Sequence, residues 1–325
     1  MQKKSILIIA LFLLSIFPSF AAQKYDFTVA QDGSGSFTTV QAAIDACKAF
    51  PDQPIVIFVK NGIYKEKIKI LACNSHLTII GESAEKTILS YNDHFEKTNR
   101  GRNSTFYTYT LMVEANDFRA ENLTIENAAG PVGQAVALHV EGDRCVFINC
   151  RLLGNQDTLY LAGETSRDYF ADCYIEGTTD FIFGAATSLF DRCTLHNKTN
   201  SYITAASTSK GKPFGFVFRN CKLTAAEGVT KAYLGRPWRD YAKVVYLNCQ
   251  IGAHIVPVGW ANWDKTGRDK TAYYAEYNNT GTGAAIGQRA AWSHQLTKEE
   301  ATAYSTEKIL APILPTEAPV QEWIK

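Results

Sequence analysis

The amino-acid sequence predicts an all-β protein folded as a right-handed parallel β-helix, a solenoid with a short helix near its N-terminus and a helix in a C-terminal tail. Two observations support this prediction. Short β-branched runs, broken by Gly, Asn or Asp, follow one another along the chain, as in 55–59, 77–80 and 87–89. In addition, one short phrase centred on a cysteine recurs at intervals typical of solenoid repeats.

The repeated phrase has Asn, Asp or Arg directly before the cysteine, and Leu or Ile two residues after it. It occurs around Cys150, Cys173, Cys193, Cys221 and Cys249, at intervals of 23, 20, 28 and 28 residues. A propeller would need about 40 residues per blade, and the leucine pattern of a leucine-rich repeat is absent. Because no linker interrupts the phrase, residues 22–325 are predicted to form a single domain.

The first 21 residues are predicted to be a secretory signal peptide, cleaved near Ala21 or Ala22. Lys3 and Lys4 precede an apolar run over 6–17, and small residues stand at both cleavage-site positions. The alternative is an N-terminal membrane anchor, but the run is short for a span of roughly 20 residues. We therefore expect an exported protein, periplasmic or secreted, with no membrane attachment after cleavage.

Composition excludes other classes of function. The formal net charge is only +1, so nothing indicates binding to nucleic acid or to a membrane surface. The hydrophobic fraction of 46% is too high for a disordered chain. No G-x-S-x-G elbow and no convincing phosphate-binding loop occurs, and none of the six histidines has metal-ligand spacing.

Two helices are predicted outside the repeats. Residues 38–50 carry apolar side chains at helical spacing, with Thr38 and Gln41 as a capping box. A helix over 298–309 is predicted to begin at a second capping box, formed by Thr297 and Glu300. We expect this tail to pack along the outside of the solenoid.

The sequence leaves the redox state of the repeated cysteines open. They can form an inward-facing stack of small buried thiols, or neighbours can be bridged, since export permits disulfides. Adjacent coils lie about 4.8 Å apart, within the Cα separation that a disulfide accepts. Cys173 and Cys193, at the shortest interval, are the candidate pair.

The repeat also places acidic residues in register. Asp157 and Asp180 each lie seven residues after a repeated cysteine, and one more step of 23 residues back reaches Gln134. If the coil length holds, these three residues occupy equivalent corners of successive coils, about 4.8 Å apart per step. Two carboxyl groups that close cannot both ionise easily, so one can serve as an acid while the other attacks.

Side chains suited to ester chemistry accompany this pair in the sequence. The amides of Gln134 and Gln156 can stabilise an oxyanion, and Arg236 can hold a carboxylate in a bidentate grip. Binding of Ca²⁺ is an alternative role for an acidic pair, but Ca²⁺ is coordinated by about six or more oxygen ligands. The other alternative is a ladder of acidic residues at the corners of successive coils that has only a structural role.

At these residues the sequence resembles the pectin methylesterases, a family of exported carbohydrate esterases. The resemblance covers nearly the whole mature chain. It is carried by motifs at 62–66 (GIYKE), 134–138 (QAVAL), 154–160 (GNQDTLY), 180–184 (DFIFG) and 234–238 (LGRPW), with support at 32–35, 259–263 and 289–292.

The resemblance implies a parallel β-helix that hydrolyses galacturonate methyl esters in pectin, with methyl-esterified pectin as its partner. We also expect a monomer without metal or cofactor. Asp180 resembles the nucleophile, Asp157 the general acid and base, and Arg236 the arginine that hydrogen-bonds the nucleophile. Gln134 and Gln156 match the oxyanion-hole amides. The expected sugar-contacting aromatics are Trp238, Phe181, Tyr160, Trp260 and Trp263.

Other functions remain possible on the same solenoid. A polysaccharide lyase would be expected to need Ca²⁺, and an inverting glycosidase spaces its carboxyl groups by roughly 6.5–9.5 Å. A non-catalytic carbohydrate-binding β-helix has no need for an acid pair with amide and arginine partners. An esterase for another ester, such as an acetyl group, is the nearest alternative.

Overall fold

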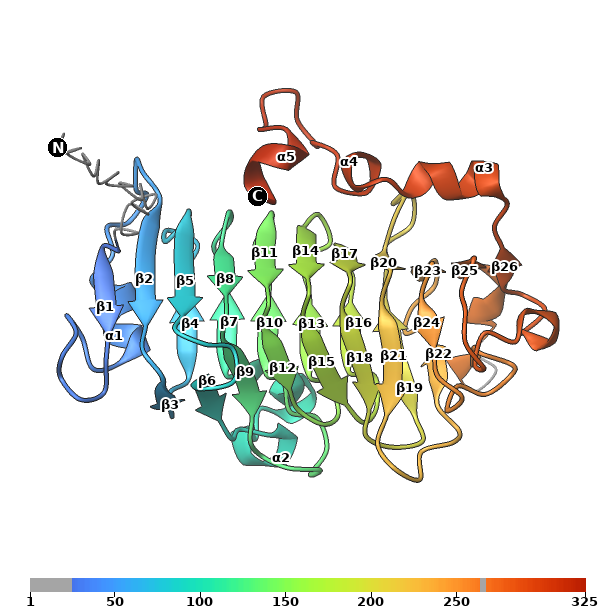
Figure 1. Cartoon of the computed structure of the whole chain (residues 1–325), viewed down its shortest axis with the longest axis horizontal. Helices are drawn as coiled ribbons and strands as arrows, with labels where there is room; N and C mark the ends of the chain where they lie inside the picture. The colour runs from blue at the N-terminus through green and yellow to red at the C-terminus, as the bar shows by residue number, and fades with distance from the viewer. Residues whose placement is uncertain (1–24, 264–266) are drawn as a thin grey trace, which may run out of the picture.

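The computed structural model describes residues 25–263 and 267–325. The predicted signal peptide and its cleavage site near Ala21 lie outside the described residues. Within them, each strand pairs in parallel with its counterparts in neighbouring coils, and the coils follow one another along the long axis of the molecule (Figure 1). The predicted parallel β-helix is confirmed.

Three sheets run along the solenoid, and each central coil contributes one strand to each of them. Sheet A contains, in spatial order, β1 (Phe27–Val29), β2 (Ile55–Val59), β5 (Leu77–Gly81), β8 (Arg119–Glu121), β11 (Cys145–Ile148), β14 (Arg167–Ala171), β17 (Thr187–Asp191), β20 (Phe216–Arg219), β23 (Lys243–Leu247), β25 (Tyr273–Tyr277) and β26 (His294–Gln295). Sheet B contains β24 (Gln250–Ile251), β21 (Lys222–Ala225), β18 (Thr194–Asn197), β15 (Tyr174–Gly177), β12 (Arg151–Leu153), β9 (Thr124–Asn127), β6 (Thr87–Tyr91) and β3 (Gly62–Tyr64). Sheet C contains β22 (Tyr233–Gly235), β19 (Tyr202–Ala206), β16 (Ile182–Gly184), β13 (Leu159–Leu161), β10 (Leu138–Val140), β7 (Leu111–Val113) and β4 (Ile68–Ile70).

The helices are short and lie outside the coils. The α-helices are α1 (Val40–Asp45), α2 (Phe95–Thr98), α3 (Lys298–Ala301), α4 (Thr306–Ile309) and α5 (Val320–Trp323). The 3₁₀ turns are η1 (Gly101–Tyr107), η3 (Arg268–Lys270), η4 (Ile286–Gln288) and η5 (Thr302–Tyr304). No helix of the described residues is long and apolar enough to cross a membrane.

The repeated cysteine phrase marks the corner between sheets A and B. The residue before each cysteine adopts the left-handed backbone conformation, with φ between 49° and 57°, at Asn149, Asp172, Arg192, Asn220 and Asn248. Asn and Asp tolerate this conformation better than most residues because their short polar side chains can hydrogen-bond locally. The polar residue of the phrase therefore makes the turn.

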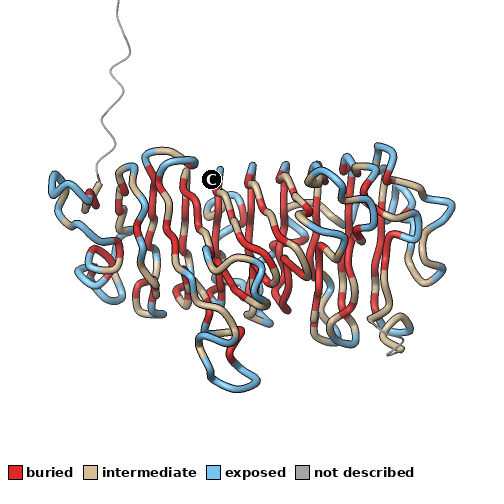
Figure 2. Tube along the Cα trace, turned by 90° about the horizontal axis from the view of Figure 1, so that it is seen from below, coloured by how far each residue is buried: buried red, intermediate tan, exposed pale blue. Residues whose placement is uncertain are grey.

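The interior is filled by columns of like side chains, and Figure 2 shows buried residues along the strands and exposed residues in the loops. The repeated cysteines form one column of free, buried thiols. Cys173 donates to the carbonyl of Phe147, and Cys193 donates to that of Phe170, one coil earlier in each case. Of the two alternatives, the structure contains the stack of thiols, and the candidate pair Cys173 and Cys193 is not bridged. A parallel column of aromatic rings runs beside the thiols, through Phe118, Phe147, Phe170, Phe190, Phe218, Tyr246, Trp260 and Tyr274.

The N-terminal helix is shorter than predicted, and its cap comes from elsewhere. Helix α1 covers only Val40–Asp45, and its N-cap residue, Thr39, makes no capping hydrogen bond. Instead, the carboxylate of Glu66, just after β3, accepts from the backbone N–H groups of Val40 and Gln41 at 2.8 and 2.9 Å. The predicted Thr38–Gln41 capping box is therefore wrong.

The C-terminal tail crosses the outside of sheet A (Figure 1). The Thr297–Glu300 capping box is confirmed. The predicted single helix is broken, however, because Ser305 is extended and starts α4 with a new cap. Arg167 of sheet A, almost fully buried, binds Glu317 of the tail at 2.6 Å. The tail thus packs along the solenoid as expected.

Candidate active site

Asp157 and Asp180 lie at the corner between sheets B and C, in two consecutive coils. Leu159 pairs with Ile182, two residues after each aspartate, so the two aspartates are in register. Both adopt the left-handed conformation, with φ of 64° and 50°. The predicted register of this pair is confirmed.

Backbone hydrogen bonds hold both aspartates to the following coil. The N–H of Asp157 donates to the carbonyl of Thr179 at 3.1 Å, and that of Asp180 donates to the carbonyl of Tyr202 at 2.8 Å. The backbone at Gly177, three residues before Asp180, is packed closely against Phe181. A Cβ added at Gly177 would lie 2.2 Å from the Cβ of Phe181. Glycine is thus required there for the chain to make this corner.

Gln134 lies one coil earlier, but its neighbour in the ladder is Gln156 rather than Asp157. The step from Gln134 to Gln156 is 22 residues and that from Leu138 to Leu159 is 21, so this coil is one to two residues shorter than the 23 assumed from the repeat. The predicted equivalence of Gln134 with Asp157 is therefore wrong. The shorter coil instead sets two half-exposed glutamines side by side at the edge of the aspartate pair.

A buried asparagine ties the segment of Gln134 to the loop that carries α2 and η1. The amide nitrogen of Asn127 lies 2.9–3.0 Å from the carbonyl oxygens of Asp93, Thr108 and Val136. The hydroxyl of Thr108 accepts from the N–H of Val136 at 2.8 Å. The carbonyl of Gln134 itself accepts from the N–H of Phe95 at 2.9 Å.

Arg236, directly after β22, holds the carboxylate of Asp180 through two hydrogen bonds. Its Nε and Nη2 donate to Oδ1 and Oδ2 of Asp180 at 3.0 and 2.7 Å. The carboxylate is 8% exposed and the arginine side chain 16%, so water screens the pair only weakly. This arrangement fixes the orientation of the Asp180 carboxylate.

The two carboxyl groups differ in their surroundings. Burial raises the pKa of Asp157 well above its ordinary value, and the nearby charge of Asp180 raises it further. Burial also raises the pKa of Asp180, but the hydrogen bonds and charge of Arg236 oppose that rise. Asp157 is therefore the group that holds a proton, and Asp180 the group that ionises first.

A hollow of about 280 Å³ opens over this pair on the outer face of sheet C. Polar groups and aromatic rings line it together: Phe95, Arg102, Thr105, Phe106, Gln134, Gln156, Asp157, Asp180, Phe183, Ala205, Arg236, Trp238 and Trp263. Tyr160 stands beside the hollow, with its ring stacked on that of Phe183 at 4.5 Å between centroids. The five catalytic candidates thus meet in one place, with Trp238 and Trp263 at its wall.

Two of the predicted sugar-contacting aromatics do not reach the hollow. Phe181 is fully buried inside the solenoid, and Trp260 is 2% exposed and belongs to the interior aromatic column. The indole N–H of Trp260 donates to Glu276 in the interior. Their prediction as cleft residues is wrong, because both side chains point inward from their coils.

Sequence reasoning missed several residues of the hollow. Phe183 is the clearest case, since Ile182 faces inward in β16 and the next residue of a strand must face outward. Phe95, Arg102 and Phe106 come from the loop between β6 and β7. That loop has no counterpart in the repeat, so no periodicity pointed to it.

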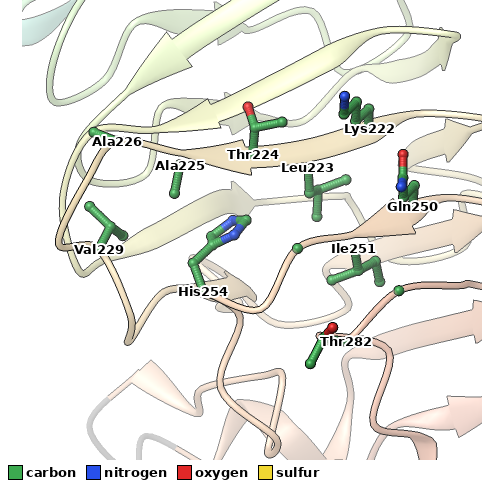
Figure 3. A pocket seen from close by; sticks show the side chains of 12 residues that line it. Lys222, Leu223, Thr224, Ala225, Ala226, Val229, Gln250, Ile251, His254 and Thr282 are labelled. Atoms are coloured by element: carbon green, nitrogen blue, oxygen red, sulfur yellow. The ribbon is translucent and has the colours of Figure 1, made fainter.

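Other hollows carry different chemistry. One of about 420 Å³ lies farther along sheet C, shares Phe106 with the first, and is lined by Lys69, Met112 and His139 from successive strands. Another, beside the paired strands β21 and β24, is lined by 12 residues without a carboxylate, and His254 faces it (Figure 3). Among residues 25–263 and 267–325, no group of three or more His, Cys, Asp or Glu side chains is arranged to hold a metal ion.

Comparison with known proteins places the chain in a family. The sequence model of the family described as Pectinesterase matches residues 26–312. "Pectinesterase 31" of Arabidopsis thaliana is 40% identical over 281 residues, which are 84% of this chain and 88% of that protein. The chain spans about half the length of other curated relatives, such as "Probable pectinesterase/pectinesterase inhibitor 13" of Arabidopsis thaliana, 39% identical over 89% of this chain and 49% of that protein.

Solved structures agree with the sequence matches. The pectin methylesterase from carrot superposes with a TM-score of 0.84 at 31% identity, over 90% of this chain and 94% of that chain. A pectin methylesterase in complex with hexasaccharide VII superposes with a TM-score of 0.79 at 29% identity, over 91% of this chain and 100% of that chain. This chain belongs to the Pectinesterase family.

Proposed function

We propose that this protein hydrolyses the methyl esters of galacturonate units in pectin, releasing methanol and leaving de-esterified pectin. One observation carries the proposal: a carboxylate held by an arginine lies in register with a second, buried carboxyl group, and burial raises the pKa of that second group. That combination suits attack on an ester followed by protonation of the leaving alcohol.

In the first step, an oxygen of Asp180 attacks the ester carbonyl carbon. The C–O bond to the methoxy group breaks, Asp157 gives its proton to the departing methanol, and an acyl-enzyme anhydride forms on Asp180. The amides of Gln134 and Gln156, which lie side by side and line the hollow, donate to the oxyanion of the tetrahedral intermediate.

In the second step, Asp157, now ionised, takes a proton from water, and the hydroxide attacks the acyl carbon. The bond to Asp180 breaks, the galacturonate carboxyl group is released, and both aspartates return to their starting states. One ester and one water thus give one carboxylic acid and one methanol.

The surroundings of the pair support a polymeric carbohydrate as substrate. Trp238 and Trp263 line the hollow beside the aspartates, and aromatic rings in such positions pack against sugar rings. The hollow at Lys69, Met112 and His139 continues the outer face of sheet C beyond Phe106, so a chain of several units fits along it. A pectin methylesterase of the same fold is known in complex with a hexasaccharide. The proposed substrate also implies that the protein is exported and works outside the cytoplasm.

Methanol release from highly methylated pectin, with and without a chelator, tests this proposal. We expect release that persists in chelator and is lost in Asp180→Asn. An unsaturated product that depends on Ca²⁺ would indicate a lyase, and the absence of methanol from the wild-type protein would refute the proposal.

A further inference from the structure

We propose that Tyr202 is a positioning residue for the nucleophile, because it holds both Asp180 and its partner Arg236. The inference rests on the proposed function for its catalytic consequence. Tyr202 begins β19, one coil after Asp180. Its carbonyl accepts from the N–H of Asp180 at 2.8 Å, and its ring centroid lies 4.0 Å from Cζ of Arg236.

A second ring contacts the same guanidinium. The ring of Trp263 lies 3.8 Å from Cζ of Arg236. Both ring centroids lie within 4.0 Å of the same atom, Cζ of Arg236, so the two rings must approach it from different sides. Tyr202 and Trp263 therefore enclose the guanidinium between them. A guanidinium carries its N–H donors in its plane and offers its faces to aromatic rings, so stacking does not compete with the bonds to Asp180.

Tyr202 is itself held by the solenoid. It pairs in register with Tyr233 of β22, and the two ring centroids are 5.2 Å apart. The Tyr202 ring is therefore attached to two rigid coils. The plane of the Arg236 guanidinium, and with it the direction of the Asp180 carboxylate, follows from the position of this ring.

The arrangement has a measurable consequence for Asp180. Its carboxyl group is buried, and the charge and hydrogen bonds of Arg236 favour its ionised form. If the Tyr202 ring is removed, the Arg236 side chain becomes more mobile and stabilises the ionised form of the Asp180 carboxyl group less. The pKa of Asp180 should then rise, and attack by Asp180 should slow, while binding of the sugar chain should change little.

The test compares Tyr202→Leu with Tyr202→Phe, which keeps the ring and the backbone carbonyl. Tyr174→Leu is the matched control, because Tyr174 is also half-buried but lies on sheet B, away from the hollow. For Tyr202→Leu we expect kcat for methylated oligogalacturonides to fall about 10- to 100-fold, with KM within about twofold of wild type. The acid limb of kcat/KM should move to higher pH. Tyr202→Phe should restore both, and Tyr174→Leu should change neither.

A second measurement does not depend on turnover. The Asp180 carboxyl group can be titrated by ¹³C NMR in aspartate-labelled protein, with its signal assigned by its loss in Asp180→Asn. We expect a higher pKa in Tyr202→Leu than in wild type and in Tyr202→Phe. An unchanged pKa with an unchanged kcat in Tyr202→Leu would overturn the inference.

The two proposals fail in different ways. If wild type releases no methanol, the proposed function fails, and the NMR titration still decides whether Tyr202 acts on Asp180. If Tyr202→Leu does not fold, Trp263→Leu loosens the other face of the guanidinium and carries the same NMR expectation. An unchanged Asp180 pKa in that variant would equally count against the inference.

Discussion

Asp157 and Asp180 occupy the same corner of consecutive coils, and each donates its backbone N–H to a carbonyl of the following coil. Their backbones are thus equivalent, but their side chains are not, because only Asp180 is paired with Arg236. Loss of Asp180 should therefore remove the nucleophile, whereas loss of Asp157 should remove the proton donor of the first step and the base of the second.

Asp180→Asn and Asp157→Asn keep the size of the side chain and should fold normally, as judged by circular dichroism and thermal unfolding. Removing the nucleophile should lower kcat by about 10⁴-fold or more, as in other enzymes with a covalent intermediate. Asp157→Asn should also lose most activity, since the leaving group would have to depart as methoxide without a proton donor. Near-normal methanol release by either folded variant would contradict its assigned role.

The pH dependence of kcat/KM should be bell-shaped. The first step needs Asp180 ionised and Asp157 protonated, so activity rises as Asp180 loses its proton and falls as Asp157 loses its own. Burial raises both pKa values, which places the acid limb above the ordinary range of an aspartic acid. The apparent pKa values of the two limbs describe the aspartate pair and not single residues, because the two carboxyl groups interact. A profile without an alkaline limb would argue against Asp157 as the acid.

Gln134→Ala should reduce kcat by about 10²–10³-fold, the usual cost of one oxyanion donor. Asn127→Ala should also reduce kcat, because Asn127 ties Asp93 and Thr108 to the strand segment after Gln134. In the Gln134→Ala background the Asn127 substitution should cost little more, if it acts through Gln134. Asn197→Ala is the control, since Asn197 is a buried asparagine at the same place in β18. Fully additive losses would refute the link between Asn127 and Gln134.

Asp168 should make folding stability depend on pH. It is fully buried, accepts a hydrogen bond from Ser188 at 2.9 Å, and burial raises its pKa well above the ordinary value. The unfolded chain releases this proton near pH 3.9, so stability falls as pH rises from there towards the folded pKa, by about 1.4 kcal/mol per pH unit. Asp168→Asn removes this slope.

Urea unfolding at pH 5 and pH 8 measures the effect of Asp168. The difference between the two pH values should be smaller in Asp168→Asn than in wild type. Asp52→Asn serves as the control, because the Asp52 side chain is 84% exposed. Equal differences in wild type and Asp168→Asn would show that Asp168 is not protonated in the folded state.

Thiol titration should count eight free cysteines in the denatured protein without any reductant. In the native protein only about one thiol should react quickly, because Cys73 is partly exposed and the other seven are buried. Fewer than eight thiols after denaturation would reveal a disulfide that the structure does not contain.

The sequence predicted the solenoid well because each coil repeats one physical requirement. A corner needs a residue that tolerates the left-handed conformation, and the interior position after it takes a small side chain, so Asn149–Cys150 and its counterparts are visible as a phrase. The site aspartates follow that phrase at a constant distance, which is why their register was predictable from spacing alone.

The sequence did not predict features that depend on contacts between distant segments or on local coil length. Glu66 caps a helix that starts 26 residues earlier, and nothing in the helix itself indicates this. The coil after Gln134 is shorter than the repeat suggests, which shifts its partner by one residue. Phe181 was expected in the hollow from the family resemblance, but it follows the left-handed turn at Asp180 and its side chain is buried inside the solenoid.

From Phe147 to Phe218 the rings of the interior aromatic column are stacked with centroids 4.6–4.8 Å apart, one ring for each coil. Such a stack acts as a spacer that is independent of the chemistry on the outer face. Coils can therefore be added or lost at either end of the molecule without moving Asp157 relative to Asp180. We therefore expect the length of polymer bound along sheet C to depend on the number of coils, and the reaction to depend on the corner that carries Asp157 and Asp180.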